Sequence, residues 1–453
     1  MGGTHQVDVV VVGLGVGGEE VAGRLAQAGL TVVGIDHTLV GGECPYWGCI
    51  PTKMMIRAGN ALGEARRVVG LAGSARVRAD WAPVARRIRE EATDDWDDKV
   101  AVDRFTGKGG RFVRGRATIT GPRRVAVDDR VYEARRGLVV ATGTTPVIPP
   151  VDGLAGTPFW TNRQAVEVET LPGSLLVLGG GAIGLELAQV FARFGVAVTV
   201  LEGGDRVLAM EEPESSETAA KALAADGVTI RTGIRAERVA HDGCFTVTLS
   251  DGSSVTGDEL LVATGRRARL DGLGLANLAV DPSARFIAVD DRMRAADGVW
   301  AVGDVTGHGA FTHLAMYEAD VAVRDILGQG GPAADYRAVS RVTFTDPEIG
   351  AVGQTERQAR DAGVDVQVGL VSLPSSSRGF VHGPGNDGFI KVVADRDRGV
   401  LIGATSAGPS GGEVLGALSV AVHAEVPVPT LLSMIYAYPT FHRAIGDALR
   451  ALR

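Results

Sequence analysis

The first clear pattern in the chain is an apolar run over residues 7–12, interrupted only by Asp8. A short continuous run of this kind is typical of a strand buried on both faces of a parallel sheet. A glycine-rich segment follows at 13–18, then a helical pattern that ends near Gly29 and a second apolar strand over 31–35 that ends at Asp36. This order of strand, turn, helix, strand and acid predicts a dinucleotide-binding βαβ unit.

The same order of elements returns in the middle of the chain. An apolar strand over 175–178 leads into glycines at 179–184, a helix to Gly195 and a strand over 197–201 that ends at Glu202. The first glycine and the acid are 23 residues apart in both copies. We therefore expect two bound dinucleotides, each with its pyrophosphate at a helix N-terminus and a ribose hydroxyl at the acid. The contacting residues are expected to be Gly13, Gly15, Gly18 and Asp36 in the first copy and Gly179, Gly181, Gly184 and Glu202 in the second.

Composition narrows the class of protein. The 453 residues suffice for about three domains. A net charge of -8 argues against a nucleic-acid partner. The most apolar stretch, 175–201, contains Glu186, Arg193 and many glycines, so we expect no membrane span. The N-terminus has no visible export signal, which predicts a cytoplasmic protein.

Two of the three cysteines, Cys44 and Cys49, lie close together downstream of the first glycine-rich turn. In a regular helix their Cα atoms would be about 8 to 9 Å apart, beyond the roughly 7 Å limit for a disulfide. Pro45 and Gly48 are expected to make the segment irregular, so that a reducible disulfide can close. In the cytoplasm such a bridge is usually transient and catalytic.

Other interpretations of the cysteines are weaker. Two buried structural thiols are the alternative for Cys44 and Cys49. A metal site is disfavoured, because no second Cys or His pair stands at ligand spacing, and we expect no metal ligands. Cys244, in a turn before an alternating strand, is expected to pack as a small hydrophobic residue.

Further motifs give the chain a specific resemblance over almost its entire length. They are Ala141-Thr142-Gly143, Ala263-Thr264-Gly265-Arg266, Trp300-Ala301-Val302-Gly303-Asp304 and the segment 343–353. With the two fingerprints and the cysteine pair, the chain resembles the FAD-dependent pyridine nucleotide-disulfide oxidoreductases, the family of dihydrolipoamide dehydrogenase, glutathione reductase and mercuric reductase. The resemblance implies an α/β fold with two Rossmann-like FAD- and NAD(P)-binding domains, a C-terminal α+β dimerisation domain and a homodimer.

Breaks in the pattern, read with the family's order, predict the domain boundaries. The FAD-binding domain is expected over 1–150 and again over 271–331, on either side of an NAD(P)-binding domain over 151–270. The interface domain is expected over 332–453, after a glycine-rich linker at 328–332. It alternates short strands, such as 389–393, with turns.

The resemblance also implies residue roles. Cys49 corresponds to the thiolate next to the flavin, and Cys44 to the interchange thiol that meets the substrate. Lys53 resembles the family lysine near the flavin, and Glu186 its usual partner; a solvated surface lysine is the alternative for Lys53. Asp304 corresponds to the aspartate that holds the ribityl chain. The other implied contacts are Gly42, Lys53, Ala117, Thr142 and Gly143 with FAD, and Ile183 and Gly265 with NAD.

The choice of nicotinamide coenzyme depends on Glu202. Its carboxylate accepts a hydrogen bond from a ribose 2'-hydroxyl and repels a 2'-phosphate, which favours NADH. Arg206 lies near enough in sequence to reach a phosphate, so NADPH stays possible.

The resemblance fails where thiol-handling members carry a His/Glu acid-base pair. Tyr438 stands at the histidine position and Arg443 at the carboxylate position. Tyrosine titrates near pH 10, so Tyr438 is a poor base for a thiol at neutral pH. His442 is a possible substitute, although a surface or structural role is the better expectation.

The segment around the cysteines is also unusual for the family. Glu43 replaces the usual threonine, and the aromatic residues Tyr46 and Trp47 replace small or aliphatic ones. The two rings are expected either to line a substrate pocket or to pack in the core.

These observations favour an NADH-dependent (or NADPH-dependent) flavoprotein reductase that passes electrons through Cys44 and Cys49 to a small-molecule disulfide, a dithiol or another two-electron acceptor. A mercuric-reductase-like metal or quinone reductase is one alternative, although the chain ends without a cysteine pair. A dihydrolipoamide dehydrogenase with weakened base catalysis, or a family carboxylase, is another. A non-enzymatic flavin redox sensor is disfavoured by the second fingerprint, which it would not need.

Overall fold

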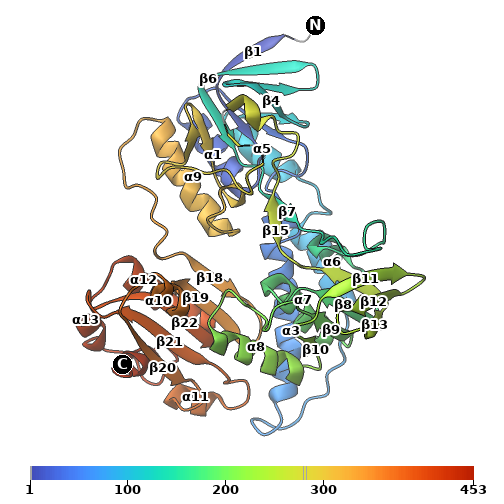
Figure 1. Ribbon diagram of the computed structural model, residues 1–453, viewed down its shortest axis with the longest axis vertical. Helices are drawn as coiled ribbons and strands as arrows, with labels where there is room; N and C mark the ends of the chain where they lie inside the picture. Colours follow the sequence, from blue (N-terminus) through green and yellow to red (C-terminus); the bar gives the residue numbers. More distant parts are fainter. Residues whose placement is uncertain (1–2, 279, 282) are drawn as a thin grey trace. The chain divides into compact units, whose positions relative to one another are not determined.

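The computed structural model describes residues 3–278, 280–281 and 283–453 (Figure 1). The chain forms two compact units. The first unit consists of segments 1–51, 86–147 and 266–335, and the second of 52–85, 148–265 and 336–453. These two units do not correspond to the domains expected from the sequence. The expected division into four segments therefore stays a prediction.

A large sheet organises the first unit. Its order is β16-β17-β6-β1-β2-β3, with β5 paired to β6 and β4 paired to β5. The strands are β1 (Thr4–Val12), β2 (Val32–Asp36), β3 (Arg111–Arg114), β4 (Thr118–Gly121), β5 (Arg124–Val127), β6 (Arg130–Val140), β16 (Arg294–Ala296) and β17 (Val299–Ala301). A separate pair joins β7 (Thr144–Pro146) to β15 (Arg266–Ala268). The strands β1, β2, β3, β6 and β17 run parallel, as expected for a dinucleotide-binding sheet.

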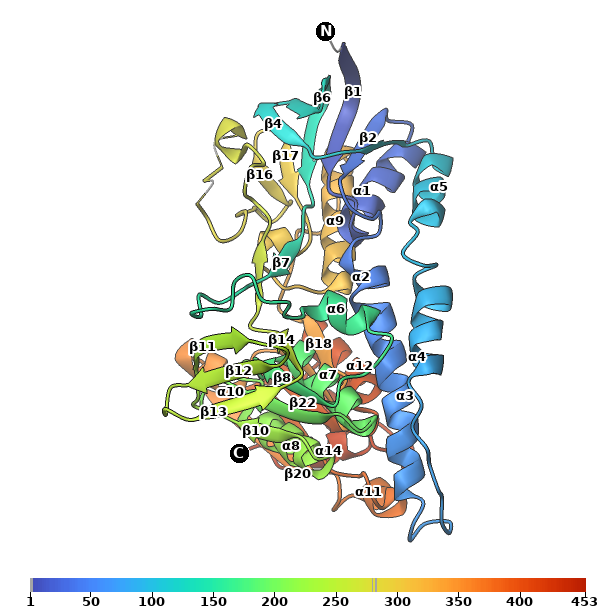
Figure 2. The same cartoon turned by 90° about the vertical axis from the view of Figure 1, so that its right-hand side faces the viewer.

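Helices cover this sheet. The two longest that lie wholly in the first unit, α1 (Val16–Gln27) and α9 (Thr312–Ile326), pack side by side (Figure 1, Figure 2). The others are α2 (Glu43–Tyr46), the π-helical turn η1 (Ile88–Ala92), α5 (Lys99–Gly107), and the 3-10 turns η2 (Leu275–Leu278) and η3 (Asp304–Thr306). Two more helices, α3 (Cys49–Arg67) and α4 (Ala82–Arg87), include residues of both units.

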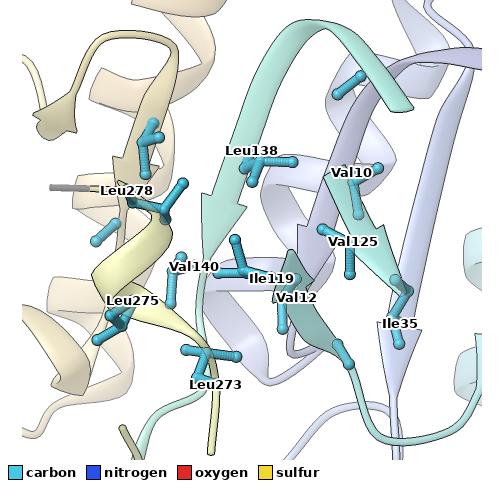
Figure 3. Packing of buried hydrophobic residues seen from close by; sticks show 14 of the residues in the cluster. Val10, Val12, Ile35, Ile119, Val125, Leu138, Val140, Leu273, Leu275 and Leu278 are labelled. Carbon is cyan, nitrogen blue, oxygen red and sulfur yellow. The ribbon is translucent and has the colours of Figure 1, made fainter. Parts of the chain in front are cut away.

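The core of the first unit lies between the parallel sheet and the strands added to its edge. Figure 3 shows Val12, Ile119, Val125 and Val140 pointing into one apolar cluster with Leu275 of η2. All five side chains are buried. The cluster thus joins residues from three separate parts of the sequence around β1, whose C-terminal end carries the first glycine-rich turn.

The second unit contains the second parallel sheet, of order β10-β9-β8-β14. Its strands are β8 (Ser174–Leu178), β9 (Ala197–Leu201), β10 (Thr229–Arg231) and β14 (Glu259–Val262). An antiparallel sheet of β11 (Ala236–His241), β12 (Phe245–Leu249) and β13 (Ser254–Gly257) accompanies it. The helices of this part are α6 (Asn162–Glu167), α7 (Ala182–Arg193) and α8 (Pro213–Ala225).

The C-terminal part of the second unit is an antiparallel sheet of order β18-β19-β22-β21-β20. The strands are β18 (Ser340–Thr343), β19 (Glu348–Gly353), β20 (Val366–Ser372), β21 (Phe389–Asp395) and β22 (Val400–Gly408). Its helices are α10 (Glu356–Asp361), α11 (Ser377–His382), α12 (Gly411–His423), α13 (Val428–Leu432) and α14 (Ala444–Arg450). Residues of α12 and α14 share one apolar cluster with β21 and β22.

The structure confirms the strands and helices predicted around both glycine-rich turns and the strand at 389–393. It corrects two local expectations. Cys244 is exposed in the turn between β11 and β12, so it does not pack as a small hydrophobic residue. The segment between the cysteines is irregular at Trp47 and Gly48, as expected for Gly48, but Pro45 lies within α2, where a first-turn proline is tolerated.

No helix in the described part of the chain is long and apolar enough to cross a membrane.

Candidate functional site

The first glycine-rich turn is built by close backbone contacts. Gly13 has a φ of +92°, and a Cβ there would lie 2.4 Å from the carbonyl oxygen of Ala141. A Cβ on Gly18 would lie 2.0 Å from the carbonyl oxygen of Gly13. Neither position has room for a side chain, so both glycines hold α1 against the ends of β1 and β6. The helix N-terminus then faces the space where a pyrophosphate binds in such folds.

Asp36 ends β2 beside this turn. Its Oδ2 accepts a hydrogen bond from the backbone N–H of Leu14 at 2.7 Å. Its Oδ1 accepts hydrogen bonds from the N–H and the hydroxyl of Thr38 at 2.8 and 2.9 Å. Since a carboxylate has about four acceptor positions, one position on Oδ2 is left for a ribose hydroxyl. These residues fit a dinucleotide such as FAD.

The second glycine-rich turn repeats these contacts in the second unit. Gly179 has a φ of +108°, and a Cβ there would lie 2.4 Å from the carbonyl oxygen of Ala263. A Cβ on Gly184 would lie 2.2 Å from the carbonyl oxygen of Gly179. A Cβ on Gly181, in contrast, would meet no atom within 4 Å in the described part of the chain. The packing explains Gly179 and Gly184, whereas Gly181 faces open space that a coenzyme can occupy.

Glu202 ends β9 as Asp36 ends β2. Its Oε2 accepts the N–H of Gly180 and its Oε1 accepts the N–H of Gly204, both at 2.6 Å. One acceptor position remains on each oxygen, which fits a ribose diol. Arg206 is turned to other partners: it donates to Ser216 Oγ at 2.5 Å and to the carbonyl oxygens of Ala209 and Glu211, each at 2.9 Å.

The other residues expected at the nicotinamide coenzyme also lie in the second unit. Ile183 is in the first turn of α7 and is exposed. Gly265 has a φ of +115° and follows β14.

A backbone contact brings the cysteine segment to the first glycine-rich turn. Gly15 and Gly41 form an isolated parallel bridge. Gly42 has a φ of +71°, and a Cβ there would lie 2.8 Å from the Cα of Gly15. Gly42 is therefore required for this approach, which places α2 directly after the fingerprint.

Cys44 and Cys49 are both thiols in the structure. Cys49 is exposed and Cys44 is half-buried. Cys49 Sγ lies 3.3 Å from Oγ1 of Thr312, the first residue of α9. The hydrogen-bond contact with Cys49 and burial raise the pKa of the Cys44 thiol, while a hydrogen bond to Thr312 lowers it. The two sulfurs thus lie together, as the redox pair requires.

A chain of polar contacts leads from the cysteine segment to Asp304. Arg266 lies 3.8 Å from Glu43 and donates from Nε to Thr144 Oγ1 at 2.8 Å. The Thr144 hydroxyl donates to Asp304 Oδ2 at 2.7 Å. Burial raises the pKa of Asp304, against the hydrogen bond from Thr144 and the charge of Arg266. Asp304 is therefore held in one orientation, consistent with a role as a fixed hydrogen-bonding group for a cofactor.

Thr142, Gly143 and Ala117, also expected at FAD, lie in the first unit, whereas Lys53 lies in the second. Thr142 donates from its hydroxyl to the carbonyl oxygen of Arg269 at 3.2 Å, and Gly143 accepts from the N–H of Arg269 at 3.1 Å. Ala117, between β3 and β4, is buried in the apolar cluster of Figure 3. A contact between Ala117 and FAD would therefore involve its backbone.

Lys53 and Glu186 meet in the second unit. Lys53 Nζ lies 2.8 Å from Glu186 Oε2 and 4.6 Å from the ring centroid of Phe344. Glu186 is buried, and its Oε1 accepts the N–H of Phe344 at 2.8 Å. The ion pair expected from the resemblance is present, and the Lys53 side chain is 35% exposed.

The position of the missing acid-base pair is exposed. Tyr438 is 70% exposed, and the Arg443 guanidinium lies 5.7 Å from its ring centroid. Arg443 Nη1 lies 3.3 Å from Asp447 Oδ2. His442 Nε2 lies 3.3 Å from the Thr440 hydroxyl. The structure thus places a cation where the family has a carboxylate.

The aromatic residues between the cysteines resolve one open question. Tyr46 is 6% exposed and Trp47 9% exposed. Burial is the main reason that the pKa of Tyr46 rises to about 12. Trp96 donates from its indole N–H to the carbonyl oxygen of Tyr46 at 3.3 Å. Both rings pack in the protein rather than lining an open pocket.

Sequence reasoning missed two residues of the site. Thr312 contacts Cys49 Sγ, and Thr144 holds Asp304. Thr144 directly follows the Ala-Thr-Gly motif and was within reach of that signal. Thr312 carries no local signal, because only the folding of α9 brings it to a cysteine some 263 positions away.

Known proteins of similar sequence belong to the family that these motifs indicate. The family model described as "Pyridine nucleotide-disulphide oxidoreductase" matches residues 7–319, and the corresponding dimerisation domain matches 339–449. A dihydrolipoyl dehydrogenase from Thermus scotoductus is 35% identical, over 98% of this chain and 97% of that protein. A mercuric reductase from Streptomyces lividans is 32% identical, over 97% of this chain and 94% of that protein.

Solved structures with the same fold include the HOCl-induced flavoprotein disulfide reductase RclA from Escherichia coli. It superposes with a TM-score of 0.85 at 27% sequence identity, over 98% of this chain and 99% of that chain. The expected fold class is thereby confirmed.

Proposed function

The chain belongs to the pyridine nucleotide-disulphide oxidoreductase family, and from that premise we propose that Cys44 and Cys49 carry electrons from NADH to a small disulfide or another two-electron acceptor. The enzyme is a flavoprotein oxidoreductase that acts on sulfur groups and uses FAD and NAD(H). The observation that carries the proposal is the contact between the two sulfurs and Thr312, in the same unit as the first fingerprint and Asp304.

The chemistry of the pair follows from its two sulfurs. Bound FAD supplies two-electron transfer between NADH and the disulfide. One hydride equivalent, which is a proton and two electrons, breaks the S–S bond. The products are one thiol and one thiolate. We assign the thiolate to Cys49 and the thiol to Cys44, which then attacks the acceptor. In the second unit, Glu186 holds Lys53 as a fixed cation near the start of α3.

NADH is the proposed reductant. Glu202 keeps acceptor positions for a ribose diol, and its charge opposes a 2'-phosphate. Arg206 donates to the hydroxyl of Ser216 and to backbone carbonyls, which leaves it little capacity for a phosphate. NADPH is expected to react more slowly.

A thiophilic metal ion is a second candidate acceptor. A metal-bound thiolate needs no proton removed, so such a substrate tolerates Tyr438 and Arg443 in place of the His/Glu pair. The relative from Streptomyces lividans is named a mercuric reductase. A dihydrolipoamide substrate, in contrast, must lose thiol protons and would be oxidised slowly here.

We further propose that the enzyme is a homodimer. Its C-terminal part matches the family's dimerisation domain over 339–449. Within this part Ile435 is 99% exposed and Phe380 is 83% exposed. Large apolar side chains left in water are typical of a surface that a partner covers. A cytoplasmic location is proposed as well, since cytosolic disulfides are usually transient and catalytic.

The test is anaerobic reduction of the FAD-loaded enzyme with one equivalent of NADH and, separately, of NADPH. Wild type is expected to develop a long-wavelength charge-transfer band, faster with NADH. A Cys49→Ser variant, which lacks the flavin-proximal thiolate, is expected to bleach without this band. Bleaching without a band in wild type would place the cysteines outside the electron path and leave a simple flavin reductase. Turnover with a small disulfide, dihydrolipoamide and Hg²⁺ would then rank the acceptors.

A further inference from the structure

Two helix N-termini meet at Cys49. Cys49 is the first residue of α3 and Thr312 the first residue of α9, and their side chains lie 3.3 Å apart, Sγ to Oγ1. The helices have 19 and 15 residues, long enough for a full macrodipole. Each N-terminus carries about half a positive charge. A thiolate is stabilised in such a place.

The Thr312 hydroxyl touches both sulfurs. It contacts Cys49 Sγ, and it is also a hydrogen-bond partner of Cys44, where it lowers the pKa of the thiol. A hydroxyl has one donor and two acceptor lone pairs. It can therefore donate to a sulfur that carries negative charge, and a lowered thiol pKa is the effect of such a donor.

We propose that Thr312 is a further catalytic residue of the thiol half-reaction, which donates a hydrogen bond to the Cys49 thiolate. The inference deepens the proposed function and rests on it. When a hydride equivalent breaks the Cys44–Cys49 bond, the proton goes to Cys44 and the negative charge stays on Cys49. The sulfurs of the disulfide carry no charge, so the Thr312 hydrogen bond is strong only after reduction. It thereby favours the charge on the sulfur nearest the flavin.

The experiment isolates the Cys49 thiolate in the FAD-loaded enzyme. Cys44→Ser leaves Cys49 as the remaining sulfur of the pair, and Thr312→Val or Thr312→Ser is added to it. Valine keeps the branched shape and removes only the hydroxyl, whereas serine keeps the hydroxyl. Two quantities are measured across a pH series: the long-wavelength band of the oxidised flavin, and the rate at which iodoacetamide alkylates Cys49. The exposed Cys244 in the same protein is the internal reference for alkylation.

Loss of a hydrogen bond to a charged group is expected to change the thiolate equilibrium about tenfold. Thr312→Val should therefore raise, by about one pH unit, the midpoint at which the band and the alkylation of Cys49 appear, and leave that of Cys244 unchanged. Thr312→Ser should restore the midpoint of the parent, since it restores the same bond. The matched control is Thr106→Val in α5, where the hydroxyl donates to the carbonyl oxygen of Val102 at 2.9 Å; it should change neither quantity.

The outcomes separate the two proposals. Equal bands and alkylation rates for Thr312→Val and its parent would overturn the role of Thr312, even if NADH reduces the cysteines. A shift of the midpoint that serine does not reverse would also overturn it, since the shift would then come from packing. If the parent lacks the band altogether, the proposed electron path fails, and the ratio of Cys49 to Cys244 alkylation still decides whether the hydroxyl stabilises the thiolate.

Discussion

Single side chains at this site carry more than one task. Glu186 pairs with Lys53 through one oxygen and accepts the N–H of Phe344 through the other. It therefore links α7, α3 and the segment after β18 within the second unit. A residue whose expected role is catalytic is thus also part of the local structure.

Removing this carboxylate should be measurable as a loss of stability. Glu186→Ala leaves the Phe344 N–H and the Lys53 ammonium without their partner, so we expect the free energy of unfolding to fall by about 1–3 kcal/mol. Glu186→Gln keeps an acceptor for Phe344 and should lose less. Denaturant unfolding of the FAD-loaded protein measures both. Glu217→Ala, at an exposed position on α8, is the control, and an equal loss there would remove the special role of Glu186.

The place of a site residue was predictable from the sequence where a motif fixes the spacing, as for Glu202 at the end of β9. It was not predictable where the partner is distant in sequence. Arg206 was a possible phosphate ligand by position, yet the fold turns it to Ser216 and to backbone carbonyls. The carbonyl oxygens of Ala209 and Glu211 come within reach of Arg206 only in the folded chain.

At the scale of elements, the two βαβ units are nearly equivalent in backbone contacts. The last glycine of each turn packs against the carbonyl oxygen of the first glycine. A Cβ on Gly18 would lie 2.0 Å from the oxygen of Gly13, and a Cβ on Gly184 would lie 2.2 Å from the oxygen of Gly179. A methyl group at either site must push the helix away from its strand. Since each unit is expected to hold a different dinucleotide, the two changes should have separate effects.

We expect Gly18→Ala to lower FAD content, measured as the flavin-to-protein absorbance ratio after purification. Gly184→Ala should keep its FAD and raise the NADH concentration needed for half-maximal flavin reduction about tenfold or more. The added methyl group of Gly181→Ala meets no atom of the described residues within 4 Å, so this variant should fold normally and affect only NADH binding. Loss of FAD from Gly184→Ala, with Gly18→Ala unaffected, would reverse the assignment of the two units.

The helical elements near the cysteines were harder to predict. Pro45 was expected to break the backbone, but it fits the first turn of α2, where a missing N–H costs nothing. Gly48 is closely packed, because a Cβ there would lie 3.0 Å from the carbonyl oxygen of Glu43. The break therefore depends on the packing of Gly48 against Glu43 of α2. No local preference of the sequence specifies this contact.

For the whole molecule, the exposed apolar side chains Ile435 and Phe380 of the C-terminal part support the proposed homodimer. Ile435→Asp places a charge where the proposed partner would bury an isoleucine, so we expect monomers. Sedimentation should give wild type at twice the mass of one chain and the variant at the mass of one chain. Val100→Asp changes another exposed apolar residue, 64% exposed on α5, and should leave the dimer intact. A monomeric wild type would contradict the proposal directly.

Buried ions connect the coenzyme-binding part of the second unit with its C-terminal sheet. Lys391 on β21 is 3% exposed and lies 3.0 Å from Glu212 and 2.9 Å from Glu214 at the start of α8. Arg341 of β18 lies 2.7 Å from Glu211. Buried charges are tolerated only when paired. These charges therefore fix where α8 meets the C-terminal sheet.

The sequence by itself determined the two βαβ units, their acids and the family, because period, spacing and glycine content are local properties that one strand-turn-helix unit expresses alone. The tertiary structure alone decided the contact of Thr312 with the cysteines, the pairing of Thr144 with Asp304 and the burial of Tyr46 and Trp47. Each of these depends on segments distant in sequence meeting in a packed core. A local pattern holds no record of such a meeting, since it arises only when the whole chain buries its apolar surface.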